Sequence, residues 1–100
     1  MAARYSLRSM AHALVLIKAS RESLATLGGQ LADVEGVSEA FSVTGEWDFV
    51  VILRVRSPEE IAETVTRRLA QVPGIRRTHT MVAFEVFSRH DLEALFSIGT

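Results

Sequence analysis

A seven-residue phrase that occurs twice constrains the fold of this chain more than any other feature. Leu31-Ala-Asp-Val-Glu-Gly-Val37 returns as Leu69-Ala-Gln-Val-Pro-Gly-Ile75, an offset of 38 residues, with leucine, alanine, valine and glycine at matching places. The same offset relates three further pairs of positions: Ile17 with Val55, Ser20 with Pro58 and Leu27 with Val65. A fixed period over most of a chain indicates two copies of one supersecondary unit.

The hydrophobic pattern predicts the same order of elements in both halves. Short apolar runs typical of strands alternate with stretches in which apolar residues lie at helical spacing. Ser57-Pro58-Glu59-Glu60 is a capping box with proline at the first helical position, and Pro73-Gly74 ends the helix that it begins. Ser20 is the expected N-cap of the other helix. The expected strands are Ala11–Ala19, about Val37–Thr44, Trp47–Arg56 and about Arg76–Phe87.

Each helix is expected to pack through one apolar stripe. The inward residues would be Leu24, Leu27, Leu31 and Val34 in the first helix and Ile61, Val65 and Leu69 in the second, with Glu63, Arg67 and Arg68 facing outward. Gly28-Gly29 interrupts the first helix and costs about 1 kcal/mol per glycine relative to alanine. The pair is either a tolerated weakness or a place of close backbone packing, and we prefer the first interpretation.

The order strand, helix, strand, strand, helix, strand predicts an α+β fold of the ferredoxin-like split βαβ type. Its four-stranded antiparallel sheet would carry both helices on one face, within residues 11–87. An N-terminal tail, residues 1–10, would precede this domain. A C-terminal tail, residues 88–100, would follow it, with Ser88 capping a short helix at Asp91–Phe96.

The face of the sheet without helices is expected to pack against a second copy of the chain. In the fourth strand, one face would carry Thr78, Thr80, Val82, Phe84 and Val86, and the other His79, Met81, Ala83, Glu85 and Phe87. We assign the first set to the uncovered face, because a surface bearing Phe84 and Val86 is poorly suited to water. The apolar content of 48% in only 100 residues also favours an oligomer.

Composition excludes several classes of function. The 11 basic and 12 acidic residues give a net charge of −1, which gives no support for nucleic-acid binding. The chain has no cysteine for disulfides or thiolate chemistry. No apolar run approaches the roughly 20 residues that span a bilayer, and the start lacks a secretory signal. We therefore expect a cytoplasmic protein that binds no membrane.

No motif indicates catalysis, a metal or a cofactor. His12, His79 and His90 are too far apart for a local metal site, and His79 is expected to be a partly exposed strand residue. Nucleophile, dinucleotide and phosphate-loop motifs do not occur. The paired carboxylates Glu59 and Glu60 are explained by the capping box and the helix dipole. We expect a non-enzymatic protein without a cofactor.

One loop combines groups that suit a ligand. Asp48 lies between Trp47 and Phe49 at the start of an apolar strand, where a carboxylate is costly unless a turn amide or a ligand's ammonium group pairs with it. The alternative interpretation of this loop is a plain hairpin without a ligand. Thr78 and Thr80 of the fourth strand offer hydroxyl groups to the same site, or they simply reflect the preference of threonine for strands. The candidate site combines polar groups with an aromatic ring and consists of Gly45, Glu46, Trp47, Asp48, Thr78 and Thr80.

Four phrases together resemble a known family. The phrases resemble, in order and spacing, the effector-binding domain of the Lrp/AsnC transcription regulators, which is also called the RAM domain. They are Val34-Glu-Gly-Val37, Gly45-Glu-Trp-Asp48, Val72-Pro-Gly-Ile75 and Arg77-Thr-His-Thr80. The resemblance implies a ferredoxin-like fold whose sheet faces pair into dimers, and rings of dimers that bind amino acids between them. It also implies that Gly45 to Asp48 frame the pocket, with backbone amides holding the carboxylate and Asp48 orienting the ammonium group. Thr78 and Thr80 would contribute from the fourth strand.

The chain departs from the family at its start. Typical members begin with a helix-turn-helix, whereas about ten residues precede the first strand here, which leaves no room for a recognition helix. We therefore expect a stand-alone effector domain that does not bind DNA directly and that senses an amino acid or joins a full-length regulator.

Two alternatives to this interpretation stay open. One is a small ferredoxin-like enzyme of the cofactor-free monooxygenase or isomerase type, which needs a polar cavity between sheet and helices. The aliphatic helix stripes argue against such a cavity. The other is a pure assembly partner whose pocket has degenerated.

Overall fold

The structure is a computed structural model that describes residues 10–87 and 89. The predicted helix at Asp91–Phe96 and most of the predicted N-terminal tail lie outside the described residues. The strands are β1 (Ala11–Ala19), β2 (Val37–Ser42), β3 (Phe49–Val55) and β4 (Ile75–Val82), and the helices are α1 (Leu27–Ala32) and α2 (Pro58–Glu63). A 3₁₀ turn at Arg21–Ser23 precedes α1, and α2 continues through a π-helical turn, Thr64–Arg68, into a 3₁₀ turn, Leu69–Gln71.

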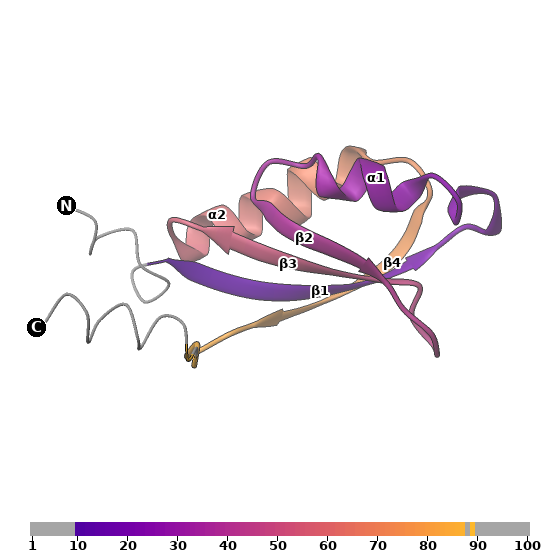
Figure 1. Cartoon of the computed structure of the whole chain (residues 1–100). Helices are drawn as coiled ribbons and strands as arrows, with labels where there is room; N and C mark the ends of the chain where they lie inside the picture. The colour runs from indigo at the N-terminus through magenta and orange to yellow at the C-terminus, as the bar shows by residue number, and fades with distance from the viewer. Residues whose placement is uncertain (1–9, 88, 90–100) are drawn as a thin grey trace, which may run out of the picture.

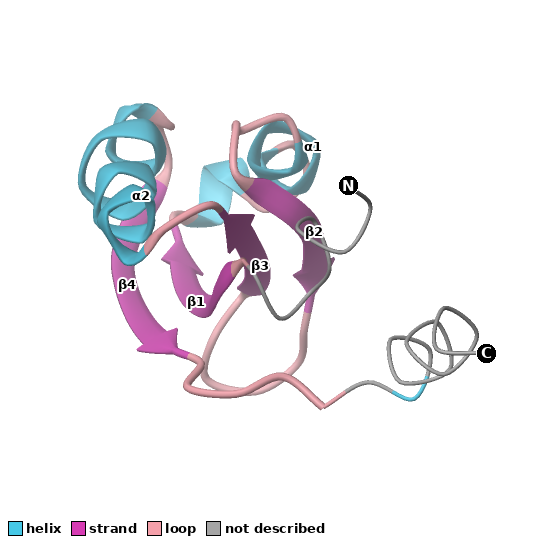
Figure 2. Cartoon of the chain, turned by 90° about the vertical axis from the view of Figure 1, so that its left-hand side faces the viewer, coloured by secondary structure: helices cyan, strands magenta, loops and turns pink. Residues whose placement is uncertain are grey.

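The strands form one antiparallel sheet in the order β2-β3-β1-β4. Both helices cover the same face of this sheet, and the opposite face is open (Figures 1 and 2). Each half of the chain therefore contributes one strand–helix–strand unit, as the internal repeat predicts. The ferredoxin-like split βαβ fold is confirmed.

The core lies between the sheet and the helices. β1 and β3 are the two inner strands, and their alternate residues are buried toward the helices. The buried apolar side chains are Ala13, Val15, Ile17 and Ala19 of β1, Phe49, Val51, Leu53 and Val55 of β3, and Leu27, Leu31, Ile61 and Leu69 of the helical segments. Apolar side chains, nearly all of them aliphatic, thus fill the space between the layers.

The first helical segment is shorter than the sequence predicts. The expected helix after Ser20 is instead a 3₁₀ turn followed by the six-residue α1, and Leu24 is 45% exposed rather than part of the inward stripe. Ser20 does not cap a helix: its N–H donates to the carbonyl of Gly74 at 2.8 Å, and its hydroxyl pairs with that of Ser23 at 2.8 Å. These contacts tie the segment to the turn before β4, and two glycines weaken the helix that follows.

The two glycines of α1 have different surroundings. A Cβ on Gly28 would lie 3.3 Å from the ring of Phe49, whereas nothing lies within 4 Å of a Cβ on Gly29. The interpretation as a tolerated weakness therefore holds for Gly29. It is wrong for Gly28, where the absent side chain allows the helix to approach the sheet.

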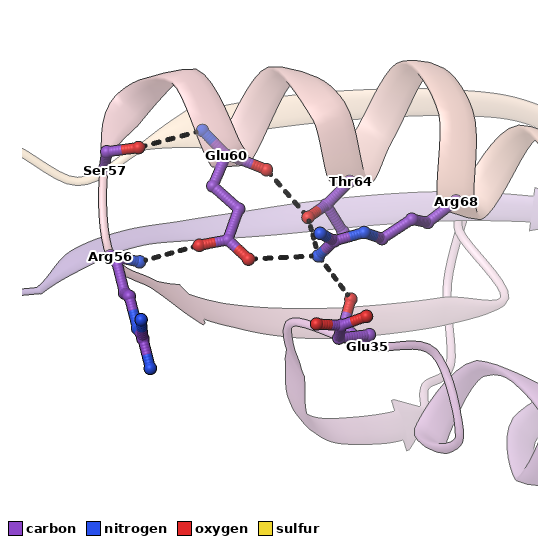
Figure 3. Close-up of polar contacts among 6 residues, drawn as sticks. All are labelled: Glu35, Arg56, Ser57, Glu60, Thr64 and Arg68. Atoms are coloured by element: carbon purple, nitrogen blue, oxygen red, sulfur yellow. Dashed lines mark hydrogen bonds and ion pairs between the residues drawn. The ribbon is translucent and has the colours of Figure 1, made fainter.

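The second helical segment begins with the expected cap but departs from regular spacing. The Ser57 hydroxyl accepts from the Glu60 N–H at 3.2 Å, and Glu60 Oε1 accepts from the Arg56 N–H at 3.1 Å. Arg68 was expected to face outward, but it is half-buried beside Glu60 (Figure 3). The π-helical turn explains this correction, because it breaks the spacing on which the stripe prediction relied.

β4 ends earlier than predicted, and its faces are the reverse of the expectation. The pairs Ile17–Thr78 and Val15–Thr80 place both threonines on the helix-covered face, because directly opposed residues share a face. The regular pairing stops at Val82, opposite Ala13 of β1, and the Ala83 N–H that follows donates to the His12 carbonyl at 2.9 Å. The assignment of Phe84 and Val86 to the open sheet face is therefore wrong, and Phe84 is 100% exposed beyond the strand.

Other residues make the open face apolar. Val15 and Ile17 point toward the helices, so the residues that alternate with them in β1 point to the open face. The residues that pair with these alternate residues in the adjoining strands lie on the open face as well. The apolar side chains on the open face are Leu14 and Leu16 of β1, Val50 and Ile52 of β3, Phe41 of β2 and Met81 of β4. The face identified for a second copy is thus apolar, although for residues other than those first expected.

Candidate functional site

The loop between β2 and β3 closes at the end of β1. Gly45 has φ of +103°, a conformation that favours glycine, and the Val43 N–H donates to the Asp48 carbonyl at 3.0 Å. The Asp48 N–H donates in turn to the Ile17 carbonyl at 2.9 Å. The loop, residues 43–48, is thereby fixed to β1 and lies on the side of the sheet away from the helices (Figure 1).

Asp48 has a backbone partner. Its Oδ2 accepts from the N–H of Ala19 at 2.8 Å, where the pairing of β1 with β4 shifts between Lys18 and Ala19. A side-chain oxygen thus serves as the acceptor for an amide near the irregular end of the strand. The sequence suggested an amide of the turn or a ligand's ammonium group as the partner, but the amide present belongs to β1 instead of the turn. The role of Asp48 toward a ligand stays a prediction.

Trp47 lies among cationic and aromatic side chains from β4. The guanidinium carbon of Arg77 is 4.8 Å from the centroid of the Trp47 ring, and the ring centroids of Trp47 and His79 are 6.2 Å apart. Both β4 residues oppose open-face positions of β1, so Trp47 also lies on the open-face side. Arg77 over the indole is a cation–π contact, which suits a partly exposed site.

Glu46 links the loop to two strands. Its carbonyl accepts from the ammonium group of Lys18 at 2.6 Å, and its carboxylate lies 3.5 Å from the guanidinium of Arg77. The Arg77 and Glu46 side chains are 62% and 72% exposed, so the pair contributes little to stability and can exchange partners. We call Lys18, Glu46, Trp47, Arg77 and His79 the loop cluster.

The structure brings together only part of the predicted site. Glu46, Trp47 and Asp48 lie around the end of β1, and Gly45 forms the bend of the loop. Thr78 and Thr80 are close along the chain but lie on the helix-covered face, away from the Trp47 ring. The assignment of all six as ligand contacts stays a prediction.

The candidate site predicted from the sequence omitted Lys18 and Arg77 of the loop cluster. It also omitted His79, which was expected to be only a partly exposed strand residue. Lys18 and Arg77 oppose each other in the β1–β4 register, and His79 follows on the same face. The alternation of β4 grouped His79 with Met81, but it could not identify their face as the one bearing the loop. Only the pairing with β1 provides that information.

The loop cluster can bind charged groups but shows no metal chemistry. Cations, carboxylates and an indole ring lie within one small surface, a combination that suits a small zwitterionic molecule. Within residues 10–87 and 89, no three histidine, aspartate or glutamate side chains gather as metal ligands would. None of the helices in this described part has the length and apolarity needed to cross a membrane.

The sheet order and the placement of both helices define a ferredoxin-like α+β domain. Within that class, the chain belongs to the Lrp/AsnC ligand-binding domain family, whose model matches residues 12–92. An uncharacterized HTH-type transcriptional regulator of Pyrococcus furiosus is 36% identical over 75 residues, which are 72% of this chain and 50% of that protein. The family predicted from the four phrases is confirmed.

Solved structures share the fold. TTHA0845 from Thermus thermophilus is 35% identical, with a TM-score of 0.73 over 80% of this chain and 100% of that chain. The Neisseria meningitidis transcriptional regulator NMB0573, solved in complex with L-Met, is 12% identical, with a TM-score of 0.69 over 79% of this chain and 53% of that chain. This chain spans about half the length of the curated relatives it matches.

Proposed function

We propose that this domain binds an amino acid at the loop cluster and acts as an effector-sensing module in transcription regulation. The family supports a regulatory, ligand-sensing role. The observation that carries the proposal is the position of Arg77 over the Trp47 ring, beside the carboxylate of Glu46. Charges of both signs are thereby presented around one apolar surface.

The chemistry of the loop cluster, together with the neighbouring Asp48, matches that of a free amino acid. Lys18 and Arg77 supply cations for its carboxylate, and Glu46 and Asp48 supply carboxylates for its ammonium group. The indole of Trp47 offers an apolar surface to its side chain. The L-Met complex of the distant NMB0573 supports the ligand class, which we carry to this chain as part of the proposal.

The proposed working form is a homodimer formed through the open sheet face, with dimers assembling further into a ring. The support is the set of apolar side chains that this face presents, including Phe41 at 47% and Met81 at 41% exposure. Contiguous apolar surface of this kind marks an interaction site. A site near the margin of such a face lets ligand binding and assembly influence each other.

A catalytic role is not part of the proposal. An active site within a ferredoxin-like enzyme would need a polar cavity between the sheet and the helices. That space is filled here by Leu27 and Leu31 at 0% exposure and by Leu69 at 1%. Occupation of the interior by aliphatic side chains supports a function located on the surface.

The first experiment is thermal unfolding against each of the 20 amino acids, with molar mass from light scattering on the same samples. A ligand at 100 times its dissociation constant should raise the free energy of unfolding by about 2.7 kcal/mol. A selective shift on a multimer would support the proposal and identify the effector. A multimer without any shift would favour a pure assembly partner, and a monomer without any shift would contradict both parts of the proposal.

A pair of adjacent arginines tests the position of the site. Arg77→Gln should weaken binding of the identified amino acid about tenfold or more, because it removes a cation expected to contact the carboxylate. Arg76→Gln is the matched control, since Arg76 is also exposed on β4 but is not part of the loop cluster. Equal loss of affinity in both variants, measured by calorimetric titration, would indicate a general charge effect and contradict the assignment.

A further inference from the structure

Two cations of the loop cluster stand directly opposite each other in the sheet. Lys18 of β1 and Arg77 of β4 are partners in the antiparallel register, so their side chains leave the same face of the sheet next to each other. Like charges in this position destabilise a pair of strands. Negative charge bound at this point would therefore stabilise the arrangement.

The domain itself neutralises the two cations only in part. The Glu46 carboxylate lies 3.5 Å from the Arg77 guanidinium, and both side chains are largely exposed. The Lys18 ammonium group instead donates to the backbone carbonyl of Glu46 at 2.6 Å. Among the residues that the structure describes, no carboxylate forms an ion pair with Lys18. The nearby Asp48 uses one carboxylate oxygen for the N–H of Ala19.

Both cations keep hydrogen-bond donors for a ligand. An ammonium group has three N–H donors and a guanidinium group has five. One donor of Lys18 goes to the Glu46 carbonyl, and Nη2 of Arg77 faces the Glu46 carboxylate. The remaining donors suffice to hold two separate carboxylates, one at each cation.

The indole of Trp47 fixes the position of one of these cations. The guanidinium carbon of Arg77 lies 4.8 Å from the centroid of the indole ring, within the range of a cation–π contact. Trp47 is partly exposed, so the methylene groups of a ligand can lie along the ring while their terminal group reaches the guanidinium. A wholly apolar ligand side chain would cover the charge of Arg77 without pairing with it, which costs free energy.

We propose that the amino acid bound at the loop cluster has an acidic side chain, as glutamate and aspartate do. This inference rests on the proposed function above and deepens it by naming the class of the effector. Such a ligand carries two carboxylates and one ammonium group. Its carboxylates bind Lys18 and Arg77, and its ammonium group binds the carboxylates of Glu46 and Asp48.

Charge distinguishes this class of ligand from the others. An amino acid with a neutral side chain leaves one of the two cations without a carboxylate. A basic side chain adds a third cation beside Lys18 and Arg77, where like charges repel. A dicarboxylate without an ammonium group brings only negative charge toward Glu46 and Asp48. An acidic amino acid satisfies both the cations and the carboxylates of the site.

The test compares ligands of nearly equal shape on the unmodified chain by calorimetric titration. Low ionic strength is needed, because salt screens exposed charges. L-glutamate should bind about tenfold more tightly than L-glutamine, since the amide lacks the charge that the second cation contacts. L-aspartate should exceed L-asparagine in the same direction. Glutarate, which lacks the ammonium group, should bind more weakly than L-glutamate.

A set of three variants tests the assignment of the second cation. Lys18→Met removes the charge but keeps the length of the side chain, so the affinities for L-glutamate and L-glutamine should become nearly equal. Lys18→Arg keeps the charge and should keep the preference, which guards against a disturbed loop in the methionine variant. Arg76→Met is the matched control, because Arg76 is an exposed cation of β4 outside the loop cluster, and it should also keep the preference.

The outcomes separate this inference from the proposed function. A preference for L-glutamate that Lys18→Met loses and the other two variants keep supports the inference. Tighter binding of any neutral or basic amino acid, or equal binding of glutarate, overturns the inference and leaves ligand binding in place. A preference that Lys18→Met retains, or that Arg76→Met or Lys18→Arg also loses, overturns the role of Lys18. Binding of none of the 20 amino acids overturns the proposed function as well.

Discussion

Asp48 connects the candidate site to the integrity of the sheet. Its Oδ2 accepts the Ala19 N–H at 2.8 Å, where the register of β1 shifts, and its own backbone pairs with Ile17 and Val43. A ligand ammonium group that approaches this carboxylate therefore shares it with a structural hydrogen bond. Substitutions at this position must distinguish the two roles.

Two substitutions at Asp48 separate binding from folding. Asp48→Asn keeps an oxygen acceptor for the Ala19 N–H but removes the charge, so we expect nearly normal stability and loss of the amino-acid-induced shift. Asp48→Ala should lower the free energy of unfolding by about 1 to 2 kcal/mol, because the amide loses its partner. Urea unfolding with and without the identified amino acid measures both effects. An asparagine variant that still responds fully to the ligand would remove Asp48 from the site.

Residue-level predictions succeeded where the deciding interaction is local. The capping oxygens of Ser57 and Glu60 are a few residues from the amides they accept from, so the pattern sufficed. The difference between Gly28 and Gly29 depends on Phe49, which packs on only one of them. The sequence indicated that Asp48 needs a partner, but the identity of that partner depends on how β1 ends.

At the scale of elements, the second helical segment is hydrogen-bonded to the turn before β2 through Arg68 of its π-helical turn. Arg68 Nη1 lies 3.1 Å from the Glu35 carbonyl, 3.2 Å from Glu60 Oε2 and 3.1 Å from the Thr64 hydroxyl (Figure 3). Gly36 makes this approach possible, because a Cβ there would lie 3.2 Å from the same nitrogen. The second helical segment is thereby linked to the first half of the repeat.

The Glu60 carboxylate makes these contacts of Arg68 sensitive to acid. The hydrogen bond from the Arg56 N–H, and then Arg68, hold the pKa of Glu60 below its usual value of 4.5, although partial burial opposes them. A carboxyl with a lowered folded-state pKa stabilises the fold above its unfolded pKa, and this stabilisation is lost as pH falls through the folded pKa. Unfolding measured from pH 7 to pH 3 should therefore show a smaller loss below about pH 4.5 in Glu60→Gln than in the unmodified chain. Identical pH profiles would exclude this contribution.

Element boundaries could be predicted where the apolar pattern of a strand stops at the same residue as the strand itself. β1 begins and ends at the predicted residues, since its apolar run is bounded at both sides. β4 was predicted to reach Phe87 because the alternation continues, whereas its pairing with β1 ends at Val82, opposite Ala13. The loop of the candidate site was found because its residues are consecutive. Lys18 and Arg77 were not predicted as part of the site, because only the pairing of β1 with β4, from opposite ends of the chain, brings them together.

At the scale of the whole molecule, the open face is the surface through which we propose that copies associate. Leu16 lies near its centre, opposite Val50 of β3 and His79 of β4, and its side chain does not contribute to the helix-covered core. A charge at this position would therefore oppose association more than folding. The leucine at position 24 is exposed elsewhere and offers a matched comparison.

Leu16→Glu should convert the assembly to folded monomers, because a carboxylate cannot be buried without a partner. Leu24→Glu should keep the oligomeric state of the unmodified chain. Light scattering gives the mass of each variant, and far-UV circular dichroism verifies that each is folded. Should Leu16→Glu retain the mass of the unmodified chain, the open face is not the dimer interface.

The sheet has two exposed margins, and both discourage further strands from attaching. Along β2, the pairing with β3 shifts between Val37 and Glu39, and β4 opens with the charged pair Arg76 and Arg77. Irregular and charged edges are the means by which natural sheets avoid growing into one another. In a chain this rich in apolar residues, such edges oppose open-ended polymerisation and fibre formation, which would compete with the dimer proposed above.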